Sequence, residues 1–261
     1  MSLTNRAFTI LRDQGPRELG RRSKEFLLRS RRTFTIRSRL NGWQNKLLYD
    51  APPDPFRPIT IDPTAVECKS SVSSRKRGLG QTVGGDWDTE ETLRPVEDLT
   101  VVRGLEQRFE ERKEWENTIY YESAKAKIQQ RGYKRGYSSM DEFLDVRCAY
   151  VDELFESIRD EGYRPNFTDS HQIPSGDTGN YTGAQNLEPI VVIGREGEIY
   201  WKDGFHRLAI ARILSIESIP VHVLVRHRQW QEFRDDIHGA ADKNGFDETV
   251  RTHPDLQDIR P

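Results

Sequence analysis

The stretch YWKDGFHRLAIARILSIESIPVHVLV, residues 200–225, contains a strand, a turn, a helix and a second strand in quick succession. The helix has an apolar side whose members recur every three residues, Leu208, Ala211 and Leu214. The second strand alternates, with one apolar face formed by Val221, Val223 and Val225. Two further apolar strands are predicted just upstream, at 189–193 and 198–202. Together these elements predict a small mixed sheet with helices, in a protein of the α+β class.

The turn between strand and helix is Asp203-Gly204-Phe205-His206-Arg207. Gly204 precedes the first turn of the helix, where free backbone N–H groups and the helix dipole favour an anion. His206 and Arg207 would place positive charge at that positive end, which is unfavourable unless an anionic ligand binds there. Asp203 could orient these side chains, hold a metal or accept a proton. A structural alternative stays open, in which Asp203 pairs with Arg207 and caps the helix.

Positive charge is concentrated at the start of the chain. Residues 1–40 contain eleven Lys and Arg against three acids, a net charge of +8, whereas the whole chain carries −2. The segment RELGRRSKEFLLRSRR, residues 17–32, predicts either a solvated arm or a helix that contacts phosphate groups. Nucleic acid and an anionic membrane would both supply such phosphates. We therefore assign residues 1–50 to a basic N-terminal arm, followed by a proline-rich linker at 51–58.

The rest of the chain is predicted to form one domain, residues 51–237. Its first strand is ITIDP, residues 59–63, and a charged helical insertion covers about 96–150. Residues 164–188 form a polar loop rich in Gly, Asn, Ser and Thr. The last segment, 238–261, is polar and is predicted to be a tail.

The helices around the insertion can be placed from local signals. Apolar residues predict a helix over about 101–128, broken along its length. A second helix starts at Ser139, because Ser139-x-x-Glu142 matches a capping box, and it ends at Gly162.

A glycine-rich loop at 78–84, GLGQTVG, superficially matches a dinucleotide-binding turn. We reject that interpretation because no buried strand precedes it and no apolar helix follows it. The adjoining GGDWD, residues 84–88, presents Asp86 and Asp88 beside an indole. A turn anchored by a buried Trp is the favoured interpretation, with an accessory site as the alternative.

Composition excludes several classes of protein. The two cysteines, Cys68 and Cys148, form neither a disulfide framework nor a metal motif, so reduced thiols are expected and metal ligands are unknown. No apolar run approaches the ~20 residues that cross a bilayer. A cytoplasmic protein is expected, peripheral to the membrane or the nucleoid if the basic arm binds there.

Several of these segments resemble those of a known family. The run from 188 to 225 resembles the ParB/sulfiredoxin fold family, in the strand IYWK, the DGFHR turn, the helix LAIARIL and the strand that begins Ile219-Pro220-Val221. The segment VDELFESIRDEGYRP, 151–165, is similar to the family's preceding helix, and ITIDP to its first strand.

Members of the family differ at the turn. Sulfiredoxins have a reactive cysteine where Phe205 stands, so the resemblance excludes their thiol chemistry. ParB proteins of chromosome partition carry Arg-Arg instead of His206-Arg207. The turn most resembles that of archaeal free-serine kinases, Asp-Gly-His-His-Arg, from which Phe205 departs and leaves the role of the first histidine unfilled.

The resemblance implies roles for individual residues. Asp203 would be catalytic, whereas Gly204, His206 and Arg207 would bind the phosphates of a nucleotide. A second catalytic acid lies early in the fold of these kinases; Glu67 is our candidate for it.

Asp86 competes with Glu67 for that role, and Asp88 is a further accessory candidate. The implied function is binding of a nucleoside di- or triphosphate with Mg²⁺, and phosphoryl transfer to a small hydroxyl compound. The alternative is a non-enzymatic ParB-like nucleotide switch or adaptor, whose basic arm binds nucleic acid or membrane through residues 1–40.

Overall fold

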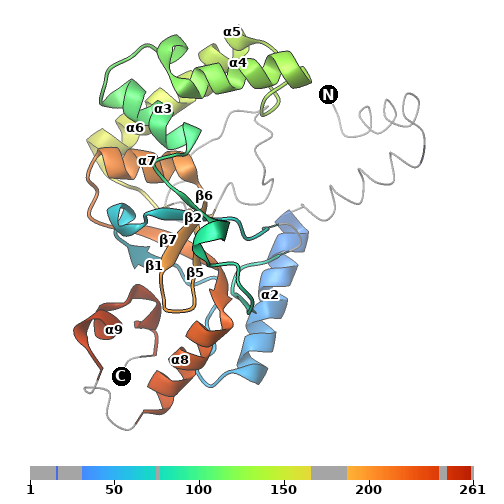
Figure 1. The fold of residues 1–261 in the computed structure, drawn as a ribbon, viewed down its shortest axis with the longest axis vertical. Coiled ribbons are helices and arrows are strands. Elements are labelled where there is room, and N and C mark those ends of the chain that lie inside the picture. Colours follow the sequence, from blue (N-terminus) through green and yellow to red (C-terminus); the bar gives the residue numbers. More distant parts are fainter. Residues whose placement is uncertain (1–15, 17–30, 75–76, 166–186, 241–245, 260–261) are drawn as a thin grey trace.

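The computed structural model describes residues 16, 31–74, 77–165, 187–240 and 246–259 (Figure 1). Seven strands form one mixed sheet in the order β1-β7-β5-β6-β2-β4, with β3 paired to β7. The strands are β1 Ile59–Ile61, β2 Cys68–Ser70, β3 Gln81–Val83, β4 Leu93–Pro95, β5 Ile190–Ile193, β6 Ile199–Asp203 and β7 Ile219–His227. The predicted α+β class is therefore confirmed.

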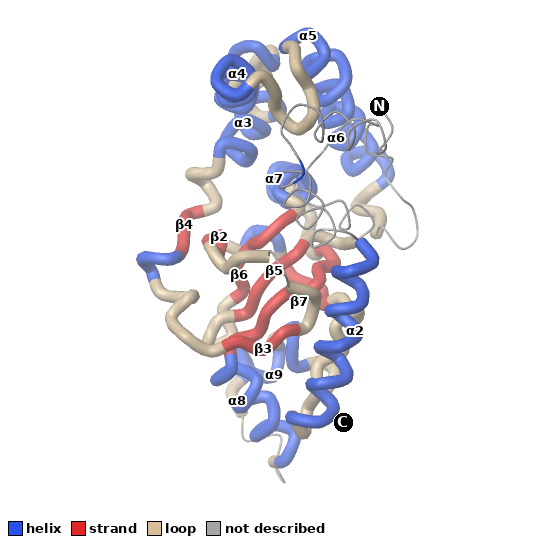
Figure 2. Tube along the Cα trace, turned by 90° about the vertical axis from the view of Figure 1, so that its right-hand side faces the viewer, coloured by secondary structure: helices blue, strands red, loops and turns tan. Residues whose placement is uncertain are grey.

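Helices cover both faces of the sheet and one of its ends (Figures 1 and 2). They are α2 Arg31–Leu48, α3 Thr100–Phe109, α4 Ile119–Arg131, α5 Met140–Glu142, α6 Ala149–Glu161, α7 Phe205–Ile213, α8 Arg228–Gly239 and α9 Glu248–Thr252. A π-helical segment, Phe143–Cys148, joins α5 to α6. No helix in these described ranges is long and apolar enough to cross a membrane.

The central unit has the predicted order. β5 and β6 form an antiparallel hairpin, and β7 pairs in parallel with β5 after the chain has passed through α7. β5 is buried at every position because both faces of the sheet are covered. Its side chains alternate between two clusters, with Val191 and Ile193 facing α7 and Ile190 and Val192 facing α2.

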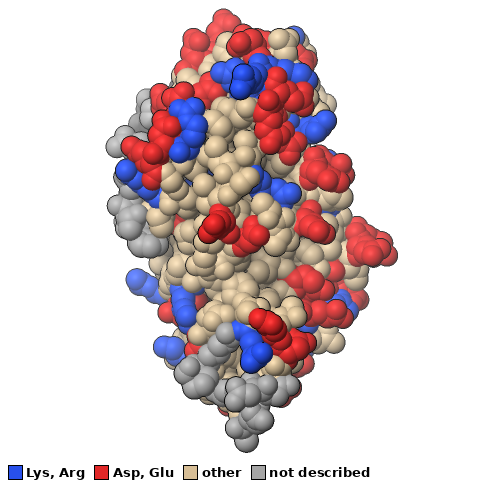
Figure 3. Space-filling model, turned by 90° about the vertical axis from the view of Figure 1, so that its left-hand side faces the viewer, with Lys and Arg blue, Asp and Glu red and all other residues tan. Residues whose placement is uncertain are grey.

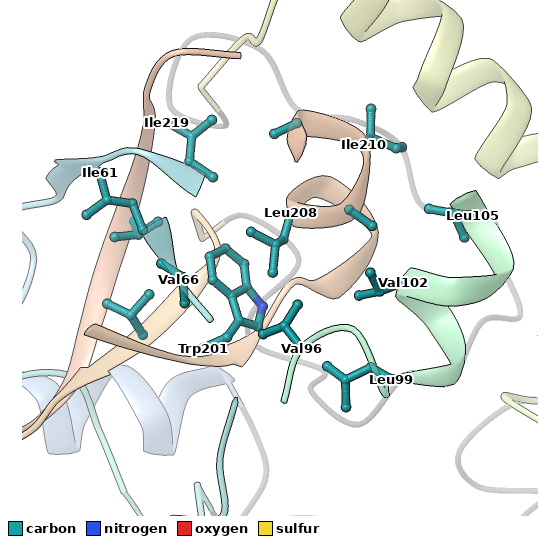
Figure 4. Close-up of a cluster of buried hydrophobic side chains, with 14 of the residues drawn as sticks. Ile61, Val66, Val96, Leu99, Val102, Leu105, Trp201, Leu208, Ile210 and Ile219 are labelled. Atoms are coloured by element: carbon teal, nitrogen blue, oxygen red, sulfur yellow. The ribbon is translucent and has the colours of Figure 1, made fainter. Parts of the chain in front are cut away.

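The larger core lies between the sheet and α7 (Figure 4). Trp201 of β6 and Leu208 of α7 are both fully buried there, and Val96 and Val102 complete the contact with α3. Burial of a Leu-sized side chain contributes roughly 1.5–3 kcal/mol, so these contacts anchor the start of α7 at the end of β6.

The insertion packs over α7 as a helical layer. α3 contacts both α4 and α7, and α6 also contacts α7. The helix predicted over 101–128 is broken as expected, and Thr118 caps α4 by accepting a hydrogen bond from the Tyr121 N–H. Ser139 likewise caps the next helix, through the N–H of Glu142 at 3.1 Å.

Two segments are packed more closely than their composition suggests. Segment 238–261 is not simply a tail, because Asp255, Leu256 and Ile259 are buried in the body of the protein. The linker 51–58 is also packed; the Ala51 N–H donates to Asp235 at 2.8 Å. Both segments look like loops by composition, and only their distant partners reveal their burial.

The basic arm divides differently from the prediction. Its last part is α2, which packs on the sheet beside β3. The helix predicted over 17–32 lies almost wholly outside the described residues, as does most of the polar loop predicted over 164–188.

Candidate anion-binding site

The DGFHR turn lies where β6 ends and α7 begins. Asp203 Oδ1 accepts a hydrogen bond from the Gly204 N–H at 2.8 Å. Gly204 has a left-handed backbone, with φ 84°, and a Cβ at this position would lie 2.9 Å from the Pro189 Cα. Only glycine fits both requirements, so the strand turns into the helix without a side-chain cap.

The first turn of α7 presents free backbone donors. Its first intrahelical hydrogen bond runs from the Leu208 N–H to the Gly204 carbonyl, at 3.2 Å. The N–H groups of Phe205, His206 and Arg207 therefore precede the ladder, and no described residue accepts from them. Together with the helix dipole, these groups favour an anion at this end.

His206 is held by the insertion. Its Nε2 lies 3.0 Å from the Tyr120 hydroxyl and 3.0 Å from Arg147 Nη2, and Arg147 Nε donates to the same hydroxyl at 3.2 Å. Burial and the nearby Arg147 and Arg135 charges hold the pKa of His206 well below its usual value. The imidazole is therefore neutral at pH 7, and the turn carries one cation fewer than the sequence suggested.

Arg147 belongs to the π-helical segment, a geometry often found at functional sites. Sequence analysis missed both it and Tyr120. Neither residue stands in a recognisable motif, so only the packing of the insertion over α7 identifies them.

Arg207 pairs with an acid that sequence analysis did not single out. Its Nη1 lies 3.0 Å from Glu188 Oε2, and its Nη2 donates to the Arg164 carbonyl at 2.7 Å. The guanidinium also stacks on the Tyr163 ring, 4.2 Å from the centroid. These contacts give Arg207 a positioning role between α6 and β5, and its role as a phosphate ligand stays a prediction. The proposed Asp203–Arg207 pair is not formed.

Asp203 lies among several cations. Lys69, Lys202 and Arg135 lie within electrostatic range of its carboxylate, and the Lys69 ammonium lies 5.2 Å from the centroid of the Phe205 ring. Burial nevertheless raises the pKa of Asp203, because desolvation outweighs these charges and the Gly204 hydrogen bond. Its Oδ2 accepts no hydrogen bond from any described residue.

A second group of cations approaches from the end of α4. Burial and the charges of Lys127, Arg135 and Arg131 lower the pKa of Lys134 to about 8. Lys134 and Arg135 stand in a tight turn, and Arg135 has a left-handed backbone with φ 54°, which is uncommon for a residue with a side chain. Within the described ranges no acid pairs with Lys69, Lys134 or Lys202.

The structure does not bring Glu67 to this site. Glu67 is exposed and lies two residues before Lys69, which faces Trp201 in the parallel register of β2 and β6. Glu67 is therefore level with Ile199, four residues before Asp203, a separation of roughly 13 Å along the strand.

Asp86 and Asp88 also lie elsewhere. Both pair with Arg195 in the β5–β6 turn, at the opposite end of β6 from Asp203. Arg195 Nη2 lies 2.7 Å from Asp88 Oδ1, and the Arg195 N–H donates to Asp88 Oδ2 at 2.7 Å. Burial opposes ionisation of Asp88, yet these hydrogen bonds lower its pKa overall. The contacts are those of a structural clamp on the hairpin.

The cysteines are distant from such chemistry. Burial raises the pKa of Cys148 to about 12 and also raises that of Cys68, so both remain thiols at neutral pH.

Comparison with known proteins found no match: no family model, no curated protein and no solved structure is similar to this chain.

Proposed function

We propose that the protein binds a nucleoside di- or triphosphate, with the phosphates at the first turn of α7. The observation that carries the proposal is the uncompensated positive charge around three free N–H groups. Lys69, Lys134 and Lys202 have no acidic partner among the described residues, although each is partly buried. Crowded ammonium groups repel one another, and a bound polyanion would relieve that repulsion.

The order of elements supports a ParB/sulfiredoxin-like plan for this core. A first strand, β1, is followed much later by α6, β5, β6, α7 and β7, with the DGFHR turn between β6 and α7. This is the order that the resemblance implies, with the insertion placed between β1 and α6.

Asp203 is the group best placed for phosphoryl transfer. Its Oδ2 is free to accept a proton from an acceptor hydroxyl, and burial has already raised its pKa. The acceptor oxygen would bond to the terminal phosphorus as the bond to the leaving diphosphate oxygen breaks, and the hydroxyl proton would pass to Asp203. Lys69 and Lys202 would stabilise the charge that develops on the phosphoryl oxygens.

The described residues do not fit a dedicated Mg²⁺ site. They contain no group of three or more His, Cys, Asp or Glu side chains placed to hold a metal, and Asp203 stands alone among cations. Mg²⁺ prefers carboxylate and phosphate oxygens, so any ion here would depend on the nucleotide.

A nucleotide switch without turnover is the second candidate. It is favoured by the position of Glu67, since the second acid implied by the kinase resemblance is not near Asp203.

Nucleotide binding can be tested with matched lysine variants. We expect ATP, ADP, CTP or GTP at about a hundred times its Kd to stabilise the fold by ~2.7 kcal/mol in thermal shift. Lys69→Met and Lys134→Met keep an unbranched apolar stem without the charge, and each should weaken binding about tenfold. Lys125→Met, on the exposed side of α4 and paired with Glu122, is the control and should bind normally. Absence of a shift with every nucleotide would refute the site.

Turnover separates the two candidates. In a phosphotransferase, Asp203→Asn should leave nucleotide affinity within a few-fold and lower phosphate transfer about 10²-fold or more. No transfer by the wild-type protein to any of a panel of small alcohols, with intact nucleotide binding, would favour the switch.

A further inference from the structure

Helix α2 is amphipathic, but its polar side faces the sheet and its apolar side faces solvent. The side that faces the sheet is largely polar and consists of Phe34, Ser38, Asn41 and Asn45. The side that faces solvent is apolar, with side chains 53–65% exposed at Ile36, Leu40, Trp43 and Leu47. Steps of four, three and four residues place these four side chains in one stripe along the helix. Exposure of this much contiguous apolar surface marks an interaction site.

Hydrogen bonds fix the rotation of the helix. The Leu79 N–H donates to Ser38 Oγ at 2.9 Å, and Asn41 Nδ2 donates to the Leu79 carbonyl at 2.8 Å. Gly78 allows this approach, because a Cβ there would lie 2.4 Å from the Ser38 nitrogen. The glycine-rich loop thus serves to dock α2. With its polar side held in this way, the helix cannot turn the apolar stripe inward without losing these bonds.

All of the charged residues of α2 are basic. Residues 26–49 contain six Lys and Arg and no Asp or Glu. Arg39 and Lys46 are exposed and seven residues apart, so they lie along one side of the stripe, with Arg37 on the other side. The face of the protein away from α2 differs, since acidic side chains there are interspersed with Lys and Arg (Figure 3).

We propose that α2 docks the protein on an anionic lipid membrane, with the helix axis parallel to the surface. The apolar stripe would enter the boundary between headgroups and acyl chains, where Trp is favoured, while Arg39 and Lys46 contact lipid phosphates. From Ile36 to Leu47 the stripe is about 16 Å long, which suits contact along the surface.

Other partners fit these features less well. Nucleic acid offers phosphates to the cations but no apolar phase for Trp43 and its neighbours. A second copy of α2 would place two acid-free, positively charged helices against each other, and their charges would repel.

The test measures binding of the full chain to vesicles at about 0.15 M salt, with phosphatidylcholine alone or with about 30% phosphatidylserine. The wild-type protein should sediment with the anionic vesicles. Trp43→Gln/Leu47→Gln and Arg39→Gln/Lys46→Gln should each lower the partition coefficient at least tenfold. Tyr133→Gln, which alters an equally exposed aromatic residue outside α2, is the control and should bind like the wild type. Thermal unfolding of each variant should match the wild type within a few degrees, because all of these side chains are exposed.

Three results would overturn the proposal. The first is wild-type vesicle binding by the Trp43→Gln/Leu47→Gln variant. The second is a protein that binds duplex DNA or RNA but not vesicles, if the Arg39→Gln/Lys46→Gln variant loses this binding and the Trp43→Gln/Leu47→Gln variant keeps it. The third is a wild-type protein that does not bind vesicles but forms a dimer, detected by light scattering, that the Trp43→Gln/Leu47→Gln variant does not form. Each of these outcomes leaves the nucleotide proposal untouched, because α7 and its lysines are unchanged.

Discussion

Two clusters of charged side chains in this protein differ in whether their charges form ion pairs. At the C-terminal end, Arg226 and Arg234 surround the buried Asp255, and Asp258 pairs with Arg234 and Arg57, so each of these charged groups has a partner of opposite sign. Around the start of α7, Lys69 and Lys202 lie within electrostatic range of a single acid, Asp203, and Lys134 lies within range of His206. None of these lysines forms an ion pair with a described acid.

The first cluster is held together by its own ion pairs, whereas the second is the one in which we propose that a ligand binds. Asp255 accepts from Arg226 Nε at 2.9 Å and from the Trp230 indole at 2.9 Å, so its desolvation is offset within the fold. Burial lowers the pKa values of Lys69, Lys134 and Lys202, as it lowers that of Arg234, but these lysines form no ion pair with a described acid. Asp203 lies within electrostatic range of Lys69 and Lys202 but forms no ion pair with either, which supports our proposal that this cluster binds an anionic ligand.

The largest expected effect breaks the balanced cluster. Asp255→Asn leaves two buried guanidinium groups without their shared carboxylate and should lower the free energy of unfolding by about 3–5 kcal/mol, measured by urea denaturation. Asp258→Asn is the matched control, since Asp258 is partly exposed, and it should lose about 1 kcal/mol or less. Equal losses in the two variants would show that burial does not govern the cluster.

The stability of the protein at low pH should also depend on the cluster around Asp255. Burial opposes ionisation of Asp255, but Arg226, Arg234 and their hydrogen bonds lower its pKa to about 2, below the ordinary 3.8. A depressed carboxylate pKa means that its stabilisation is complete above about pH 4 and is lost as the pH falls through about 2. The melting temperature should therefore fall steeply between these values in the wild type. In Asp255→Asn the fall should be shallower, and parallel curves would contradict the assignment.

The unbalanced cluster should respond to its ligand by taking up a proton. The pKa of Lys134 is about 8, and a bound polyphosphate would raise it. Nucleotide binding at pH 8 should therefore take up a fraction of a proton, and affinity should decline above that pH. Calorimetry in buffers of different ionisation enthalpy measures this uptake, which Lys134→Met should reduce. Lys125→Met should keep it.

The smallest effect is expected at Glu67. This side chain is exposed, and it lies beside Ile199 of β6, four residues before Asp203. Glu67→Gln should therefore change the free energy of unfolding by less than about 0.5 kcal/mol and leave any transfer activity within about twofold. A loss comparable to that of Asp203→Asn would restore Glu67 as the second acid.

Local sequence signals were sufficient to predict the central unit and its turn. The period of apolar residues over 189–225 predicted β5, β6, α7 and β7, because strand and helix periods are local properties of the backbone. The Asp203-Gly204 step located the junction for the same reason, since glycine is required by the conformation of its own residue.

Which charges are balanced and which apolar residues are buried depends on long-range packing, which local signals do not reveal. Arg207 pairs with Glu188, and Asp255 with Arg226 and Arg234, across distances in sequence that no local pattern encodes. The orientation of α2 was equally hidden, because periodicity identifies an apolar face but not the side on which it lies. In α2 the polar face found hydrogen-bond partners in the loop at 78–80, and so the apolar face was left outside.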